Sequence, residues 1–352
     1  MAYFRVLSTQ IEKIYSLLKK NEDWLIIINA DPDAMGSAVA LQRLLRYRVK
    51  SVHIARINTI SRPDNLAMIK KLHIHMRTWE DGMKEKYHKF AIVDSQPHHS
   101  PIFKDIPFSI VIDHHPLPDK NNPPLLAEQY HFDVRPDYGA TSSMLTEYLY
   151  NAEIKPGKYV ATALLYGIRT DTSTFSRHTI EVDLRAYHYL TRFFDQNLLT
   201  AILRSEYFIQ WLPYFSRAFE KLRPCGIGQF TYLSDVDNTD ILVVIADFFL
   251  KVYGLKYIIV AGINNKNAVC IFRGSKYNLG ELAQKAFSDI GSAGGHAALA
   301  RAEIPLSVLK SGKNPIKIDF RRKNFSKELH DEIEKFLFLR LKQNGSSKKI
   351  TK

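Results

Sequence analysis

Residues 24–36 read Trp-Leu-Ile-Ile-Ile-Asn-Ala-Asp-Pro-Asp-Ala-Met-Gly, and this stretch decides the fold class. The uninterrupted apolar run at 24–28 is typical of a strand that is buried on both faces of a sheet. The segment that follows, residues 34–47, carries apolar residues at helical spacing. A buried strand that leads directly into a helix is the start of a parallel α/β sheet.

The rest of the first half continues this alternation of strands and helices. We expect strands at residues 51–57, 89–93 and 109–112, and helices at 139–150 and 159–166. The predicted fold class is therefore α/β, with a parallel sheet in a first domain at residues 1–190.

The chain changes character in its second half. Residues 184–222 contain no glycine and repeat large apolar side chains at helical spacing, so we expect helices there, with residues 191–224 as a helical linker. Residues 225–343 are expected to form a smaller α/β domain, with strands at 228–233, 241–245, 257–263 and 267–273 and helices at 280–287 and 328–341. Residues 344–352 are expected to be a basic, disordered tail.

Composition narrows the class of protein. A chain of 352 residues corresponds to about two domains. Its 45% hydrophobic content excludes disordered and fibrous proteins, and two cysteines exclude a disulfide framework. No apolar run approaches the roughly 20 residues of a membrane span, so we expect a cytoplasmic protein without a membrane partner. Lys and Arg exceed Asp and Glu by 49 − 36 = 13, which favours anionic partners such as nucleotides or nucleic acid.

Carboxylates follow apolar segments at four places in the first domain. Asp31 and Asp33 follow the first strand, Asp94 and Asp113 end later strands, and Asp171 follows another apolar segment. Each could be an ordinary helix cap or turn residue. Together they favour one sheet edge at which crowded carboxylates are held by cations. Oxygen ligands with imidazoles suit Mn²⁺, Mg²⁺ or Fe²⁺.

Ordered motifs in both domains resemble those of the DHH phosphoesterase superfamily. The resemblance spans about residues 20–305. Within the superfamily, the chain is similar to the stand-alone branch of nanoRNases and pAp phosphatases, in which a DHH-associated domain binds substrate. The matching motifs are Asn29 to Ser37, Val93-Asp94-Ser95, Asp113-His114-His115-Pro116, Ala140-Thr141-Ser142, Gly167 to Thr172, Phe272-Arg273-Gly274-Ser275 and Gly294-Gly295-His296.

The resemblance implies a two-metal site, usually of Mn²⁺, that hydrolyses phosphodiesters or phosphoanhydrides. His115 would face the scissile phosphate, and Asp113 would orient the histidines from behind. The residues implied as metal ligands are Asp31, Asp33, Asp94, His114 and Asp171. The residues implied as substrate-binding are Arg273, Gly294, Gly295 and His296, with Asn29 at the cleft.

One position departs from the family pattern. Many members carry a metal-binding histidine where this chain has Ile27, and Asn29 stands where the exonuclease branch has an Asp. We therefore expect one tight and one weak Mn²⁺ site, with Mg²⁺ as an alternative metal. Arg301 follows the glycine motif and is either a phosphate contact or a surface charge.

These features predict a phosphoesterase that acts on short oligonucleotides or small nucleotides such as nanoRNA, pAp or dinucleotides. Alternatives are a cyclic-dinucleotide phosphodiesterase, a single-strand exonuclease, a pyro- or polyphosphatase, and a non-catalytic nucleotide or RNA binder on a decayed fold. The sequence leaves open the substrate, the choice between RNA and DNA, and whether the chain forms a homodimer.

Overall fold

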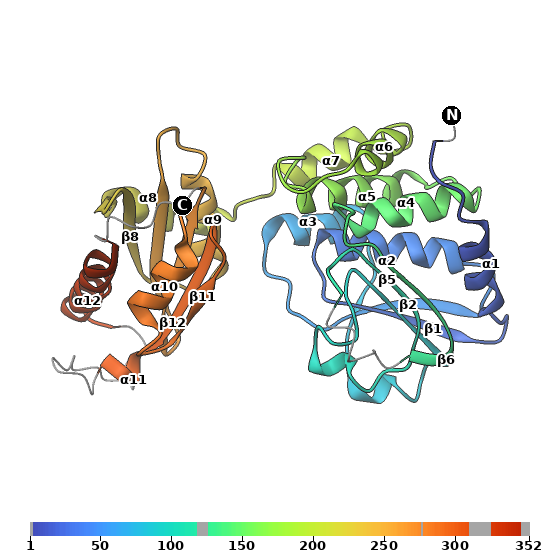
Figure 1. The fold of residues 1–352 in the computed structure, drawn as a ribbon, viewed down its shortest axis with the longest axis horizontal. Coiled ribbons are helices and arrows are strands. Elements are labelled where there is room, and N and C mark those ends of the chain that lie inside the picture. The colour runs from blue at the N-terminus through green and yellow to red at the C-terminus, as the bar shows by residue number, and fades with distance from the viewer. Residues whose placement is uncertain (1–2, 118–125, 276, 310–324, 346–352) are drawn as a thin grey trace. The chain divides into compact units, whose positions relative to one another are not determined.

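The computed structural model describes residues 3–117, 126–275, 277–309 and 325–345. The chain forms two compact units, Met1–Tyr207 and Phe208–Lys352 (Figure 1). The division falls within the segment that we expected as a linker, residues 191–224. Helix α7 (Gln196–Leu203) belongs to the first unit and helix α8 (Leu212–Glu220) to the second.

The first unit contains a six-stranded sheet in the order β3-β2-β1-β4-β5-β6, and every neighbouring pair is parallel. The strands predicted at 24–28, 51–57, 89–93 and 109–112 all form. The strands of this sheet are β1 (Asp23–Ile28), β2 (Ser51–Arg56), β3 (Arg77–Thr78), β4 (Lys89–Val93), β5 (Phe108–Asp113) and β6 (Leu126–Val134).

Successive side chains along a strand point to opposite faces of this sheet, and both faces are buried. Ile26 and Ile28 pack into the larger core with the helices, whereas Leu25 and Ile27 pack on the other face with Phe108. Figure 1 shows α2, α4 and α5 along the larger core. The helices of this unit are α1 (Ser8–Ser16), α2 (Pro32–Leu45), α3 (Pro63–Lys71), α4 (Thr141–Asn151), α5 (Lys158–Asp171), α6 (Glu181–Leu190) and α7.

The second unit contains a mixed six-stranded sheet in the order β11-β12-β10-β9-β8-β7, in which only β8 and β9 pair in parallel among the described strands. Its elements are β7 (Arg223–Cys225), β8 (Gly228–Asp235), α9 (Asp240–Phe249), β9 (Tyr257–Asn264), β10 (Asn267–Gly274), α10 (Leu279–Phe287), β11 (Ser292–Gly295), β12 (Leu299–Pro305), α11 (Leu306–Leu309) and α12 (Lys327–Gly345), in addition to α8. Helices α8 and α9 cover one face, and α10 and α12 cover the other.

Two predictions about secondary structure are wrong. The strand expected at 241–245 lies within α9, whose buried side chains form one helical stripe that ends at Phe249. A short apolar run does not distinguish a strand from a buried helix. Asp171 ends helix α5 and does not follow a strand. Residues 346–352 of the expected tail lie outside the described residues.

No helix among the described residues is long and apolar enough to cross a membrane.

Two glycines let α2, α4 and α5 approach each other closely. A methyl group on Gly36 would lie 2.8 Å from the Ala163 carbonyl oxygen. One on Gly167 would lie 2.5 Å from Ser142 Oγ and 3.0 Å from Asp33 Cα. Since Asp33 and Ser142 are fully or almost fully buried, neither has room to retreat.

We predict that Gly167→Ala destabilises the protein by about 1–3 kcal/mol, because overpacking outweighs the better helix propensity of alanine. Urea unfolding of the full chain measures the change. Gly82→Ala is the matched control, since a methyl group there meets no atom within 4 Å. Equal unfolding midpoints for Gly167→Ala and wild type would contradict the close packing described above.

Candidate metal centre

The carboxyl ends of three neighbouring strands bring the predicted site residues to one sheet edge. Asp33 lies in the first turn of α2, just after β1. Asp94 comes directly after β4, and Asp113 ends β5. The last residue of α5, Asp171, joins them from the helical layer. The shared edge therefore results from the β1-β4-β5 order of the sheet.

His114 lies at the centre of this cluster. Its Nε2 lies 3.0 Å from Asp171 Oδ2 and 3.6 Å from Asp94 Oδ1. His114 belongs to two groups of three possible metal ligands. One group is Asp33, His114 and Asp171, and the other is Asp94, His114 and His115. Within each group the ligand atoms lie within 4.8 Å of one another. Four of the five predicted metal ligands thus converge, and their role as ligands stays a prediction.

The orientation of the His114 ring leaves Nε2 available to a cation. Nδ1 lies 3.0 Å from the Tyr138 carbonyl oxygen, to which it donates a hydrogen bond. Nε2 is buried and makes no hydrogen bond of good geometry, although Asp171 is close. Desolvation lowers the pKa of His114, but the Asp171 contact and the charge of Asp33 outweigh it and raise this pKa to about 9.

Asp33, a residue of α2, is buried against the N-terminus of helix α4. Its two oxygens accept hydrogen bonds from the backbone N–H groups of Thr141 at 2.7 Å and Ser142 at 2.8 Å. These groups would otherwise be unsatisfied at a helix that has no side-chain cap of its own. Desolvation, followed by the charge of Asp171, nevertheless raises the pKa of Asp33 to about 6.

Asp94 is held in a strained position. Its φ of +57° lies in the left-handed region that side chains other than glycine seldom adopt. The Thr141 hydroxyl donates a hydrogen bond to its Oδ1 at 2.9 Å. Desolvation and the charges of Asp33, Asp31 and Asp171 raise the pKa of Asp94 well above its ordinary value. Backbone strain at a charged, buried residue is typical of functional sites.

These observations fit a divalent cation. Buried carboxylates with raised pKa values lie around Nε2 of His114, and either protons or a metal ion must offset their repulsion. The donor atoms are oxygen and nitrogen, which suit Mn²⁺, Mg²⁺ or Fe²⁺. Both cysteines are buried within the second unit.

Asp113 and Gln96 position His115. Asp113 is fully buried, and its Oδ1 accepts a hydrogen bond from His115 Nδ1 at 2.8 Å. Gln96 donates to Asp113 Oδ2 at 2.7 Å. Burial alone would raise the pKa of Asp113, but these two hydrogen bonds lower it. The hydrogen bond from His115 to Asp113 also raises the pKa of His115 and leaves Nε2 as the free ring nitrogen.

The expectation that Asp113 orients both histidines is met only for His115. His114 is held by the Tyr138 carbonyl, and the Tyr138 hydroxyl donates to Glu147 at 2.8 Å. Arg135 completes this buried group with a 2.6 Å ion pair to Glu147. The positioning roles of Gln96, Tyr138 and Thr141 were not predicted from the sequence. Only Thr141 lies within one of the motifs that resemble the DHH superfamily.

The residues expected at the weaker metal site do not join either group. Asp31 caps helix α2, accepting a hydrogen bond from the Ala34 N–H at 2.9 Å. Its pKa is raised by desolvation and then by the charge of Asp171, so it lies near the cluster. Asn29 is exposed. Ile27 is fully buried in the core, as its apolar character predicts.

In the second unit, β10 carries Arg273, whose Nε donates to Asp247 Oδ1 at 2.9 Å. Gly295 adopts a φ of +146° in the turn before β12, and His296 is exposed beside it. The N–H of Gly274 donates to the Ala298 carbonyl, so the two motifs lie on adjacent segments.

The glycine motif of the second unit lies within its sheet. Residues Ser292–Gly295 form strand β11. The first N–H groups of helix α10, from Leu279 and Gly280, donate to the carbonyls of Ala297 and His296. Those amides are therefore satisfied within the protein. Arg301 forms an ion pair with Glu303 at 2.6 Å, which favours its interpretation as a surface charge.

Comparisons with known proteins agree with this architecture. Residues 24–168 match the sequence profile of the DHH family, N-terminal domain. Over 290 residues the chain is 37% identical to the uncharacterized protein MJ1633 of Methanocaldococcus jannaschii, a match that covers 81% of this chain. It covers 58% of that protein, so the chain spans less than two thirds of its relative's length.

A solved structure of an exopolyphosphatase-related protein from Bacteroides fragilis is similar with a TM-score of 0.65 and 14% identity. The similarity covers 96% of this chain and 98% of that one. At this identity it shows the fold, and the predicted α/β class is confirmed. The resemblance to DHH proteins is likewise confirmed by the family match, and DHH phosphoesterases depend on divalent metal ions.

We predict that protons compete with the metal at His114. With a pKa of about 9, the imidazole is protonated at pH 7 in the absence of a cation, and binding must release that proton. The apparent affinity for Mn²⁺, measured by calorimetry, should rise about tenfold between pH 7 and pH 8 and level off above pH 9. His98→Gln, at an exposed neighbour outside both groups, should keep this slope. An affinity that does not change with pH would contradict the protonated state of His114.

Proposed function

We propose that this chain, whose residues 24–168 match the sequence profile of the DHH family, N-terminal domain, hydrolyses phosphoester bonds with the help of divalent metal ions. We propose short oligonucleotides or small nucleotides, such as nanoRNA, pAp and dinucleotides, as its substrates and Mn²⁺ as its preferred metal. The observation that carries this proposal is the convergence of Asp33, Asp94 and Asp171 on one nitrogen of His114.

In this proposal Asp33, Asp94, His114 and Asp171 hold the metal. Bound divalent cations lower the pKa of a water molecule and offset the negative charge of a phosphate. His114 belongs to both groups of possible ligands, and Asp94 is proposed to contact both metal ions, so the loss of either residue would disrupt the whole site.

His115 is proposed to act on the substrate itself. The hydrogen bond from Nδ1 to Asp113 fixes the ring, and Nε2 makes no hydrogen bond to any residue that the structure describes. Because its pKa is raised, the imidazole stays protonated to a higher pH and can donate a proton to the leaving oxygen from Nε2. Half of this side chain is exposed, which suits a group that must reach a substrate.

The second unit is proposed to bind the part of the nucleotide that does not react. Arg273 donates one hydrogen bond to Asp247 and one to the Phe272 carbonyl of its own strand. Because a guanidinium has five N–H donors, others remain for a ligand. His296 is exposed on the adjacent segment. Together they offer a planar donor and a ring to a phosphate and a base.

The proposal predicts that Asp94→Ala lowers turnover by at least two to three orders of magnitude, because a shared ligand is lost from the cluster. Release of mononucleotide from a 5′-labelled dinucleotide in Mn²⁺ measures it. Asp105→Ala, at an exposed site, is the matched control and should keep wild-type turnover.

The same assay discriminates among substrates when it includes pAp, cyclic di-AMP, a 20-mer and tripolyphosphate. Cleavage of the dinucleotide or pAp supports the proposal, whereas cleavage of tripolyphosphate alone would replace it with a phosphoanhydride hydrolase. Binding of nucleotides without any cleavage in Mn²⁺ would identify a non-catalytic binder.

The position of Ile27 predicts unequal metal sites. Ile27 is buried and Asn29 is exposed, so neither the histidine nor the additional carboxylate of the family pattern is present at these two positions. Calorimetry of the wild type should therefore resolve one tight and one weak Mn²⁺ ion. Asn29→Asp adds a charged oxygen and should tighten the weak one, with Asn29→Ser as a control of similar polarity but no charge. Two equally tight ions in the wild type would show that another residue replaces the missing histidine.

A further inference from the structure

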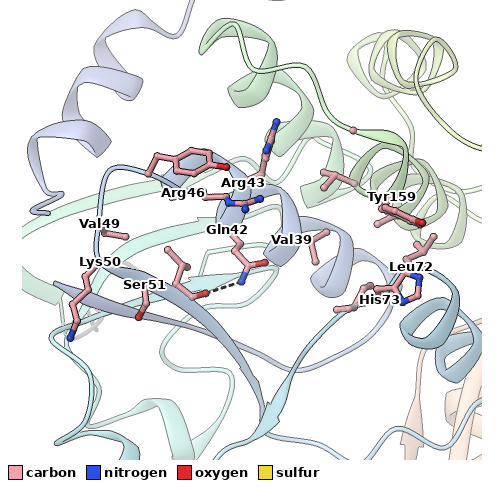
Figure 2. Close-up of a pocket in the computed structure, with 16 residues that line it drawn as sticks. Val39, Gln42, Arg43, Arg46, Val49, Lys50, Ser51, Leu72, His73 and Tyr159 are labelled. Atoms are coloured by element: carbon pink, nitrogen blue, oxygen red, sulfur yellow. Dashed lines mark hydrogen bonds between the residues drawn. The ribbon is translucent and has the colours of Figure 1, made fainter. Parts of the chain in front are cut away.

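A cavity of about 540 Å³ lies in the first unit, away from the metal centre (Figure 2). It is lined by the C-terminal part of α2, the start of β2, the residues after α3 and the start of α5. The metal cluster lies at the opposite ends of α2 and α5. At 1.5 Å per residue, the ten residues from Asp33 to Arg43 along α2 place about 15 Å between the metal cluster and the arginines of the cavity.

The rim of this cavity is strongly basic. Arg43, Arg46 and Lys50 line it, and no Asp or Glu is among the lining residues. Lys50 is paired with Asp23 at 3.0 Å. Neither Arg43 nor Arg46 has an ion pair within the part of the chain that the structure describes. Arg43 in α2 and Arg46 directly after it thus offer two guanidinium groups that can donate hydrogen bonds to phosphate oxygens.

Rings and apolar side chains complete the lining. Figure 2 shows Arg43 and Arg46 on one side of the cavity and His73 with Tyr159 on another. The rings of His73 and Tyr159 lie edge to face with centroids 5.4 Å apart. Between these two sides lie apolar groups that include Val39, Leu72 and Val160. This combination of an apolar floor, aromatic walls and a few charged donors is typical of pockets for small ligands.

Two helices end on rings that face this cavity. Tyr47 after α2 and His73 after α3 adopt left-handed φ values of +69° and +52°. Glycine is the usual residue at such helix ends, because side chains are disfavoured there. At both helix ends a ring lines the cavity at a position where glycine would adopt the backbone conformation more easily. Arg46 stacks over the Tyr47 ring at 4.8 Å.

We propose that this cavity is a second binding site, for a nucleoside phosphate, separate from the metal centre. Arg43 and Arg46 bind the phosphates, and Tyr159 with His73 stacks against the base. A bare phosphate would leave the apolar floor and the rings unused. With the phosphates on these arginines, about 15 Å along α2 from Asp33, the proposed site is separate from the metal cluster.

The test is binding of ADP to the full chain in EDTA, so that metal-dependent chemistry does not contribute. Calorimetry with wild type should give saturable binding, and hydrogen exchange should show protection at residues 39–52 and 157–163. Arg43→Gln with Arg46→Gln should weaken that binding at least tenfold. Arg48→Gln removes one positive charge from the segment after α2, but Arg48 stacks on Tyr15 and does not line the cavity, so the ADP affinity of this variant should stay within twofold of wild type.

Further variants and ligands separate the base from the phosphate. Tyr159→Leu should weaken ADP binding, while Tyr159→Phe keeps the ring and should preserve it. Tripolyphosphate should bind more weakly than ADP and should not respond to Tyr159→Leu. Equal loss in Arg48→Gln, or absence of protection at this cavity, would overturn the proposal. Tripolyphosphate as tight as ADP would overturn the choice of a nucleoside.

Discussion

Mutual repulsion among carboxylates at one sheet edge is the constraint on which this structure depends. Asp33, Asp94 and Asp171 gather around a single imidazole nitrogen in a largely buried setting. At the low effective dielectric of such a site, unscreened like charges cost several kcal/mol. Desolvation, followed by the charges of the neighbouring carboxylates, raises the pKa values of Asp33 and Asp94, and a divalent cation offsets both effects without protonating the carboxylates.

Much of the surrounding fold serves to hold these groups in place. The N-terminus of α4 donates two N–H groups to Asp33, and its first side chain, Thr141, donates to Asp94. Gly167 allows α5 to pass close to Asp33, which brings Asp171 to the cluster. The buried group of Arg135, Tyr138 and Glu147 fixes the carbonyl that orients His114. A ring of such hydrogen bonds keeps ligand atoms in position before any cation binds.

Local sequence patterns predict the strands and their terminal carboxylates, because both features lie within one short segment. They do not predict Gln96 beside Asp113, or Tyr138 beside His114, since those contacts join separate segments and have no local signature. The helix at Ile241–Ile245 was missed for a different reason: five consecutive apolar positions fit either a buried strand or a buried helix. The basic cavity combines the ends of α2 and α3 with the start of α5, which lies more than 100 residues after α2, and only the folded chain brings them together.

The most direct test of the central claim is to locate the metal. Crystals of the full chain soaked in MnCl₂ and measured at the manganese absorption edge give an anomalous difference map. The account predicts a strong peak bounded by Asp33, Asp94, His114 and Asp171, with His114 bound through Nε2. A map without a peak there, with His114 Nε2 still 3.0 Å from Asp171, would show that a proton on His114 offsets the carboxylate charge instead of a metal.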